Sequence, residues 1–165
     1  MKILEINVFN YRKGGSEAVY FSTMELLKEH GDDVVNYALK WPENYPSPYE
    51  QFFPESKETR SGVLRPIKNI VNYFYDAEAA RNLETLIEME KPDLAQVHLI
   101  WGQITGSILP VLKRHHIPVI FTIHEYRIVC PAYTFRNGLG EVCEQCQGKH
   151  FYKCVTNKCC KGSYG

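Results

Sequence analysis

Short apolar runs alternate along the chain with longer stretches in which apolar residues recur at i, i+3 and i+4. The apolar runs, each of strand length, are Lys2–Val8, Asp33–Leu39, Leu94–His98 and Val119–Ile123. The stretches with helical spacing are Ser16–His30, Pro66–Tyr75, Asp76–Lys91 and Gly106–His115. Strands that alternate with helices of this length predict a doubly wound α/β fold, with a parallel sheet and helices on both faces.

Two of the predicted helices show which side chains should face the sheet. The first helix carries a broad apolar face made of Ala18, Val19, Phe21, Met24, Leu26 and Leu27. The helix at 76–91 is expected to turn inward Ala79, Ala80, Leu83, Leu86, Ile87 and Met89. In the last helix Pro110 is compatible with a first turn, where its missing N–H is not needed.

The alternation of apolar runs and helical stretches is lost in a long internal loop and at the C-terminal end. Residues 40–62 hold four prolines and several aromatic residues, and a loop of this length in a compact domain is usually functional or mobile. Beyond the last strand the chain is rich in Tyr, Gly, Cys and Lys. We therefore expect one α/β domain over residues 1–128 and an irregular, cysteine-rich extension of it over 129–165.

Composition narrows the class of protein. The 165 residues carry 19 basic and 19 acidic side chains, so the net charge is zero with neutral histidines. A neutral chain lacks the basic surface that nucleic acid requires, and no nucleic-acid partner is expected. Because Glu5 and Asn7 interrupt any signal-peptide core, and no apolar stretch approaches the length of a membrane span, we expect a soluble, cytoplasmic protein.

The turn between the first strand and the first helix is a candidate ligand site. Gly14 and Gly15 allow the backbone to approach a ligand closely, and Ser16 and Glu17 open the helix. The free N–H groups of a helix start favour a phosphate or carboxylate. The spacing matches neither a phosphate-binding loop nor a three-glycine dinucleotide fingerprint. The alternative is an ordinary flexible turn before a helix that Ser16 caps.

Polar residues at the strand ends supply further candidates, because ligands of doubly wound sheets bind beyond the carboxyl ends of the strands. The third strand ends in His98. This histidine either contacts a substrate or forms hydrogen bonds that stabilise the structure. The fourth strand is followed by His124 and Glu125. A placed imidazole can donate to a sugar hydroxyl or act in acid–base chemistry. The alternative is that Glu125 caps the following loop while His124 packs.

All six cysteines lie between Cys130 and Cys160. A secreted disulfide scaffold spreads its bridges over the chain, whereas clustering in a cytosolic chain indicates a metal site or reduced thiols. The spacing of Cys143, Cys146, Cys154 and Cys159 can close a tetrahedral zinc site. An intramolecular disulfide and reduced thiols remain alternatives to zinc. A thioredoxin-like role is not expected, because the paired cysteines do not follow a first strand.

Taken in order, these motifs resemble the N-terminal half of a glycosyltransferase of family 4, a group of retaining enzymes with two Rossmann-like domains (the GT-B architecture). The resembling stretches are Lys2–Leu4, Gly14–Glu17, Lys91–Asp93 before the strand that ends in His98, His124–Glu125, and Cys130–Pro131 with the cysteine cluster after it. The resemblance extends over essentially the whole chain. It implies a Rossmann-like sheet for the N-terminal domain.

The resemblance also implies roles for the candidate residues. The loop Gly14–Glu17 would lie near the donor diphosphate and the acceptor, and His98 would line the acceptor side. His124 matches the histidine that contacts the donor sugar and is the candidate catalytic residue, while Glu125 replaces an aspartate of the family. Family members are thought to use a front-face mechanism in which the donor phosphate helps to deprotonate the acceptor. No protein nucleophile and no cofactor are then required, and any zinc is structural.

The family continues into a second domain that binds the donor nucleotide and carries paired glutamates, and this domain is missing after Gly165. We therefore expect the acceptor-side half of a hexosyltransferase-like enzyme that is inactive as this fragment. The resemblance implies bacterial polysaccharide or glycolipid synthesis from a nucleotide-sugar donor. The acceptor would be a saccharide or lipid-linked saccharide, with peripheral contact at the inner face of the membrane. The alternative is a non-catalytic α/β ligand-binding module with a zinc or disulfide cluster.

Overall fold

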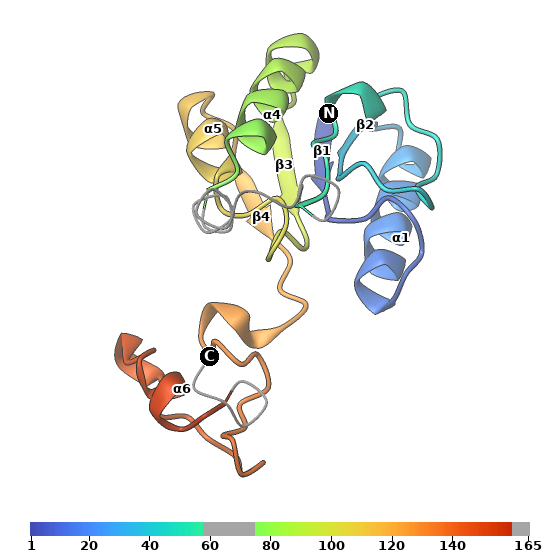
Figure 1. The fold of residues 1–165 in the computed structure, drawn as a ribbon. Coiled ribbons are helices and arrows are strands. Elements are labelled where there is room, and N and C mark those ends of the chain that lie inside the picture. Colours follow the sequence, from blue (N-terminus) through green and yellow to red (C-terminus); the bar gives the residue numbers. More distant parts are fainter. Residues whose placement is uncertain (58–74, 160–165) are drawn as a thin grey trace. The chain divides into compact units, whose positions relative to one another are not determined.

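A computed structural model describes residues 1–57 and 75–159 of the chain (Figure 1). The chain forms two compact units, Met1–Thr122 and Ile123–Gly165, and each is described by itself. The helix expected at Pro66–Tyr75 lies outside the described residues apart from its last residue, and Cys160 lies outside them as well.

The first unit contains a four-stranded sheet in which neighbouring strands are parallel, in the order β2-β1-β3-β4. The strands are β1 (Lys2–Ile6), β2 (Asp33–Tyr37), β3 (Leu94–Val97) and β4 (Val119–Phe121). Each begins where the apolar pattern predicts and ends one or two residues earlier, which is the usual uncertainty of element boundaries.

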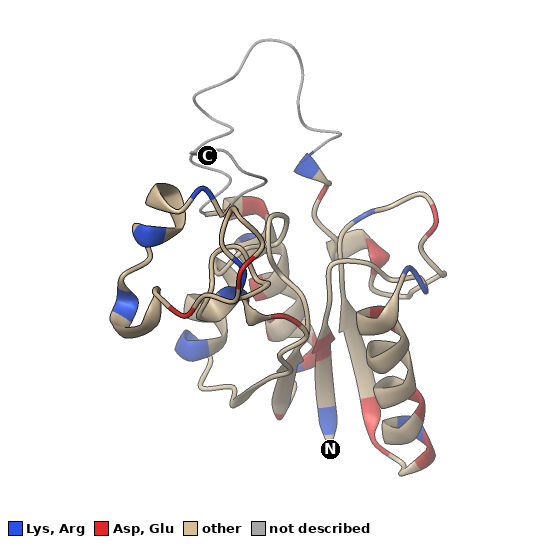
Figure 2. Cartoon of the chain, turned by 90° about the horizontal axis from the view of Figure 1, so that it is seen from below, with Lys and Arg blue, Asp and Glu red and all other residues tan. Residues whose placement is uncertain are grey.

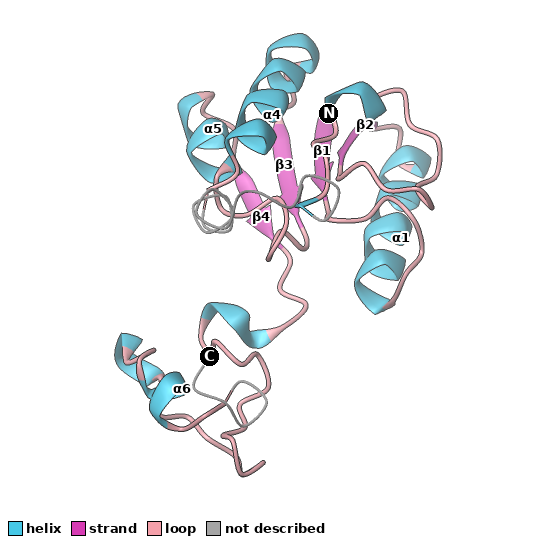
Figure 3. Ribbon diagram, in the orientation of Figure 1, coloured by secondary structure: helices cyan, strands magenta, loops and turns pink. Residues whose placement is uncertain are grey.

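The direction of the crossovers explains where the helices lie. The chain passes from β1 to β2 through α1 (Gly15–Glu29) in one direction across the sheet. It returns to β3 after α4 (Ala77–Glu90) and reaches β4 after α5 (Ile108–Arg114) in the other direction. Right-handed crossovers in opposite directions place helices on opposite faces, and Figure 3 shows α1 on one side of the strands and α4 with α5 on the other. The doubly wound, Rossmann-like α/β fold is confirmed.

Helix α4 follows its sequence signals closely. Its N-cap Asp76 accepts hydrogen bonds from the backbone N–H groups of Glu78 and Ala79, and its C-cap Lys91 is left-handed with a φ of 49°. The buried face consists of the expected Ala79, Ala80, Leu83, Leu86 and Ile87. Met89 does not join this face, since half of its surface is exposed. Helix α5 begins at Ile108, so that Pro110 falls in the first turn as expected.

Helix α1 presents a different face from the one its apolar residues predict. The buried residues are Glu17, Tyr20 and Met24, whereas Val19 is 45% exposed and Leu26 is 65% exposed. The apolar-face prediction was therefore wrong for Val19 and Leu26, whereas Met24 is buried and Ala18, Phe21 and Leu27 are half-buried. The physical reason is that α1 packs over polar side chains that follow β1, so that Glu17 finds a hydrogen-bonding partner in Asn7 and Tyr20 finds one in Asn10.

The core of the first unit lies between the sheet and its helices and includes part of the long loop. Phe53, in the described part of that loop, is buried against Tyr37, with ring centroids 6.2 Å apart. The loop contains a short 3₁₀ helix, Glu50–Phe52, and a parallel bridge between Lys40 and Glu55. Residues 40–57 therefore serve the structure of the domain in addition to any other role.

The second unit has little regular structure and is cysteine-rich, as expected. It contains the 3₁₀ turns Tyr126–Ile128 and Gln147–Lys149 and the four-residue helix α6 (Lys153–Thr156). An antiparallel bridge joins Arg136 to Val142. Its buried hydrophobic cluster consists of Cys130, Ala132 and Cys154.

Two properties bear on the environment of the protein. No helix in the described part of the chain is both long enough and apolar enough to cross a bilayer. Lys and Arg do not gather along one element among the described residues, and α1 carries both signs of charge (Figure 2).

Candidate functional site

A buried polar pair occupies the point where the strand order reverses. In β1, Glu5 is 0% exposed, and His98, which directly follows β3, is 0% exposed too. His98 Nε2 lies 3.0 Å from Glu5 Oε2. Glu5 Oε1 is the buried side-chain atom of the described residues that has no hydrogen-bond partner. The crevice at a strand-order reversal is where doubly wound sheets bind ligands, so this pair lies beneath the expected site.

Asn7 connects the three segments that meet above this pair. Its amide nitrogen lies 2.9 Å from the carbonyl oxygen of Phe9 and 3.4 Å from Glu17 Oε1. Its Oδ1 accepts a hydrogen bond of 3.2 Å from the backbone N–H of Leu99. Asn7 thus holds together the ends of β1 and β3 and the start of α1. Glu17, predicted to bind substrate, is 3% exposed and bonds within this network.

Tyr20 of α1 covers the network from above. Its ring packs edge-on against His98 at a centroid distance of 5.5 Å, and its hydroxyl lies 3.5 Å from Asn10 Oδ1. Burial raises the pKa of Tyr20 well above its ordinary value of 10.0, and the nearby Glu5 adds to the rise. Tyr20 therefore stays neutral and acts as a hydrogen-bonding wall rather than as a base.

The start of α1 is open to solvent, as a ligand-binding turn requires. Gly14 and Gly15 are exposed, and a Cβ at Gly15 would meet nothing within 4 Å. No side chain caps this helix end. The alternative in which Ser16 is the cap is wrong, because the N-cap position is Gly14 and Ser16 Oγ donates to Glu17 Oε2 at 3.0 Å.

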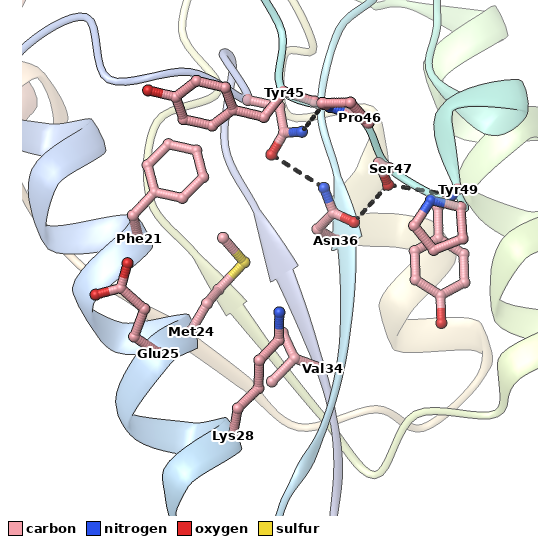
Figure 4. A pocket seen from close by; sticks show the side chains of 12 residues that line it. Phe21, Met24, Glu25, Lys28, Val34, Asn36, Tyr45, Pro46, Ser47 and Tyr49 are labelled. Atoms are coloured by element: carbon pink, nitrogen blue, oxygen red, sulfur yellow. Dashed lines mark hydrogen bonds between the residues drawn. The ribbon is translucent and has the colours of Figure 1, made fainter.

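A pocket of about 290 Å³ lies between α1, β2 and the loop after β2, and its α1 side chains come from Phe21 to Lys28. Figure 4 shows Phe21 and Tyr45 next to each other at one end of the pocket, with Glu25 and Lys28 further along α1. Phe21 and Tyr45 pack against each other with ring centroids 5.3 Å apart. The pocket also includes the apolar side chains Met24 and Val34 and the proline residues Pro46 and Pro48.

A chain of amide and hydroxyl groups forms the polar wall of this pocket. Asn36 Nδ2 donates to Asn10 Oδ1 at 3.0 Å, and Ser47 Oγ donates to Asn36 Oδ1 at 2.7 Å (Figure 4). Asn10 Nδ2 donates to the carbonyl oxygen of Tyr45 at 2.8 Å. These bonds preorganise the loop after β2, so the pocket presents a fixed set of aromatic and polar groups.

His124 and Glu125, the other predicted pair, belong to the second unit. Glu125 Oε1 lies 2.6 Å from Arg127 Nε, and the guanidinium of Arg127 lies 4.7 Å from the ring centroid of Tyr133. Glu125 stands at the N-cap position of the turn Tyr126–Ile128 without a side-chain capping bond, so the capping alternative is wrong. The structure thus brings the glycine turn and His98 to one edge of the sheet, and His124 and Glu125 remain candidates within their own unit.

The five described cysteines gather in the second unit. Cys130, Cys143, Cys146, Cys154 and Cys159 form no disulfide and line one small cavity. Burial raises the pKa of Cys146, and the neighbouring thiols of Cys130, Cys159 and Cys143 raise it further. Within residues 1–57 and 75–159 no group of three or more histidine, cysteine, aspartate or glutamate side chains is arranged to hold a metal ion.

The sequence-based site omitted Glu5, Asn7 and the pocket wall. Glu5 and Asn7 carry a readable signal, because two polar residues two positions apart in an apolar strand share one face. The pocket has no such signal, since its members come from separate segments. No protein-family model matches the chain, and no curated protein matches it.

Proposed function

We propose that this chain is the acceptor-side domain of a nucleotide-sugar-dependent, retaining glycosyltransferase. The doubly wound sheet supports the proposal because its strand order reverses between β1 and β3, where such sheets bind ligands. The uncapped start of α1 also supports it, since free N–H groups at a helix start favour a diphosphate.

The observation that carries the proposal is the pocket behind Phe21 and Tyr45. Aromatic rings fit the apolar face of a sugar ring, and fixed amide and hydroxyl groups fit its hydroxyls. A volume of about 290 Å³ accommodates a single sugar ring. Asn10, Asn36 and Ser47 supply the polar wall, and we assign the pocket to the saccharide acceptor.

In this proposal the first unit binds and orients the saccharide acceptor. Proton transfer and contact with the donor sugar are carried out by other parts of the enzyme. Glu5, Asn7 and His98 form buried hydrogen bonds between the ends of β1 and β3 and do not line the pocket. His124 of the second unit is the candidate for contact with the donor sugar. A donor-binding domain beyond this chain completes the enzyme, which acts on a saccharide or lipid-linked saccharide at the inner face of the membrane.

The second candidate function is a non-catalytic module that binds a small ligand in the same pocket. The observation that favours it is that Asn10, Asn36 and Ser47 are already preorganised within this chain. The two candidates differ in their response to nucleotides. A transferase domain of this kind binds sugars and leaves the nucleotide to a donor-binding domain, whereas a self-sufficient module that uses the α1 turn binds the nucleotide on its own.

The test is a titration of the chain with hexoses, N-acetylhexosamines, hexuronates and nucleotide sugars, followed by ¹H–¹⁵N NMR. We expect sugars to shift the amide signals of the pocket, and Tyr45→Ala to weaken sugar binding about fivefold through loss of aromatic contact. Tyr75→Ala is the matched control, because Tyr75 is 48% exposed, as Tyr45 is at 47%, and does not line the pocket.

Two outcomes would contradict the transferase proposal. The first is that no sugar binds, or that Tyr45→Ala and Tyr75→Ala bind sugar alike. The second is tight binding of free nucleotide by this chain alone, which supports the binding module. The intact mass of the natural polypeptide provides a separate check, since a two-domain enzyme has about twice the mass of one domain of this size.

A further inference from the structure

The second unit brings cysteines from four separate places in the sequence to one cavity. Cys130 and Cys154 are 7% and 6% exposed, and Cys143, Cys146 and Cys159 complete the lining. The cavity has a volume of about 10 Å³. That is room for a single particle of about the size of a water molecule, which suits one metal ion and excludes an organic cofactor.

The unit lacks the apolar core that normally stabilises a fold. Among its described residues the buried hydrophobic side chains are Cys130, Ala132 and Cys154, whereas Leu139 and Val142 are more than three-quarters exposed. Units of about 40 residues usually need disulfides, a metal or oligomerisation to fold. The five described cysteines form no disulfide.

Backbone hydrogen bonds hold the cysteine-bearing segments in place. The N–H of Cys143 donates to the carbonyl oxygen of Phe135 at 2.8 Å, and the N–H of Cys159 donates to the carbonyl oxygen of Cys154 at 3.0 Å. The N–H of Gly138 donates to the carbonyl oxygen of Asn157 at 2.9 Å. These bonds hold the backbone of the segments that carry Cys143, Cys154 and Cys159. In their present rotamers the thiols of the described residues do not form a group that holds a metal, and rotation about χ1 turns a thiol toward or away from the cavity.

We propose that this unit binds one structural Zn²⁺ through four thiolates, with Cys130 as a ligand together with the chelating pair Cys143 and Cys146. The fourth thiolate comes from the segment that carries Cys154 and Cys159. One pair close in sequence and two further thiolates supply the four sulfur ligands of a closed tetrahedral site. Cys130 is the new element, because sequence spacing alone places the site at Cys143, Cys146, Cys154 and Cys159.

Zinc binding in this unit is a folding reaction, because thiolates that are far apart in the unfolded chain come together around the ion. Removal of the metal should therefore loosen residues 123–159 and leave the first unit folded. The proposal does not depend on the glycosyltransferase function, since a structural metal would serve a transferase domain and a binding module equally well.

The test is the metal content and thiol state of the full chain, purified under reducing conditions. We expect about one zinc ion per chain and, after exchange, the visible absorption of tetrahedral thiolate-bound Co²⁺. Cys130→Ser and the double variant Cys154→Ser/Cys159→Ser should each lose zinc. Thr156→Ala, a change in the same segment outside the cavity lining, should keep it.

Hydrogen exchange read by mass spectrometry separates loss of metal from loss of the whole fold. A chelator should raise exchange in peptides from 123–159 and leave those from 75–122 unchanged. The proposal is overturned if the chain neither contains zinc nor binds Co²⁺, or if Cys130→Ser binds zinc as tightly as the parent. Resistance of the thiols to alkylation in denaturant without reductant also overturns it, because that result shows disulfides.

Discussion

At the scale of single residues, the full burial of Glu5 and His98 is the feature that most needs a physical explanation. Ionisable side chains are rarely wholly buried, and they are then almost always paired. His98 Nε2 provides a partner for Glu5 Oε2, while Glu5 Oε1 has none among the described residues. An unsatisfied buried oxygen lowers stability, and natural proteins tolerate such a cost mainly at functional sites.

We expect His98→Phe to lower the free energy of unfolding by about 3 kcal/mol, because it leaves both oxygens of the Glu5 carboxylate without a partner. Urea unfolding followed by tryptophan fluorescence measures this, since Trp41 and Trp101 both lie in the first unit. The double variant Glu5→Leu/His98→Phe should recover most of the loss, as apolar replacements leave no buried polar group unpaired. If His98→Phe and the parent protein were equally stable, the claim that the buried Glu5 carboxylate needs His98 as its partner would be refuted.

At the scale of elements, α1 and α4 show how far local rules reach. The features that start, orient and end α4 are all local in the sequence. They are an aspartate N-cap, an apolar stripe, and a left-handed residue before Pro92. Helix α1 begins without a side-chain cap and buries Glu17 and Tyr20 in place of its more apolar neighbours. The difference arises because α4 packs on apolar side chains, whereas α1 packs on the polar face of β1.

Asp76→Ala should destabilise the first unit by about 1 kcal/mol, since it removes the acceptor of the hydrogen bonds from Glu78 and Ala79. Asp76→Asn is the matched control, because an asparagine side chain also caps well and retains most of the stability. Thermal unfolding of both variants gives the comparison. A loss as large in Asp76→Asn as in Asp76→Ala would show that the cap is not the cause.

At the scale of the whole molecule, the two units are stabilised in different ways. The first has an apolar core between the sheet and the helices α4 and α5, with side chains such as Leu4, Leu83 and Phe53 fully buried. The second depends on tight backbone contacts around the cysteine cavity. A Cβ at Gly138 would lie 2.6 Å from the carbonyl oxygen of Lys158 and 2.7 Å from that of Asn157, so only glycine fits there.

Gly138→Ala should therefore separate the cysteine-bearing segments and destabilise the second unit by about 2 kcal/mol. Gly15→Ala is the control, since its added Cβ meets nothing within 4 Å and its backbone is not left-handed. We expect hydrogen exchange to rise in residues 123–159 for Gly138→Ala and to stay unchanged there for Gly15→Ala. Unchanged exchange in Gly138→Ala would show that this contact does not hold the unit together.

The sequence by itself determined the α/β class, the approximate strands and helices, and the meeting of the glycine turn with His98 at one edge of the sheet. These follow from hydrophobic period, helix caps and the parallel order, all of which act locally or by simple topology. Only the tertiary structure decided which face α1 buries, that Glu5 and Asn7 support His98, and that Phe21 and Tyr45 border a pocket. Each of these depends on contacts between segments that are far apart in the sequence, and local sequence patterns do not specify those contacts.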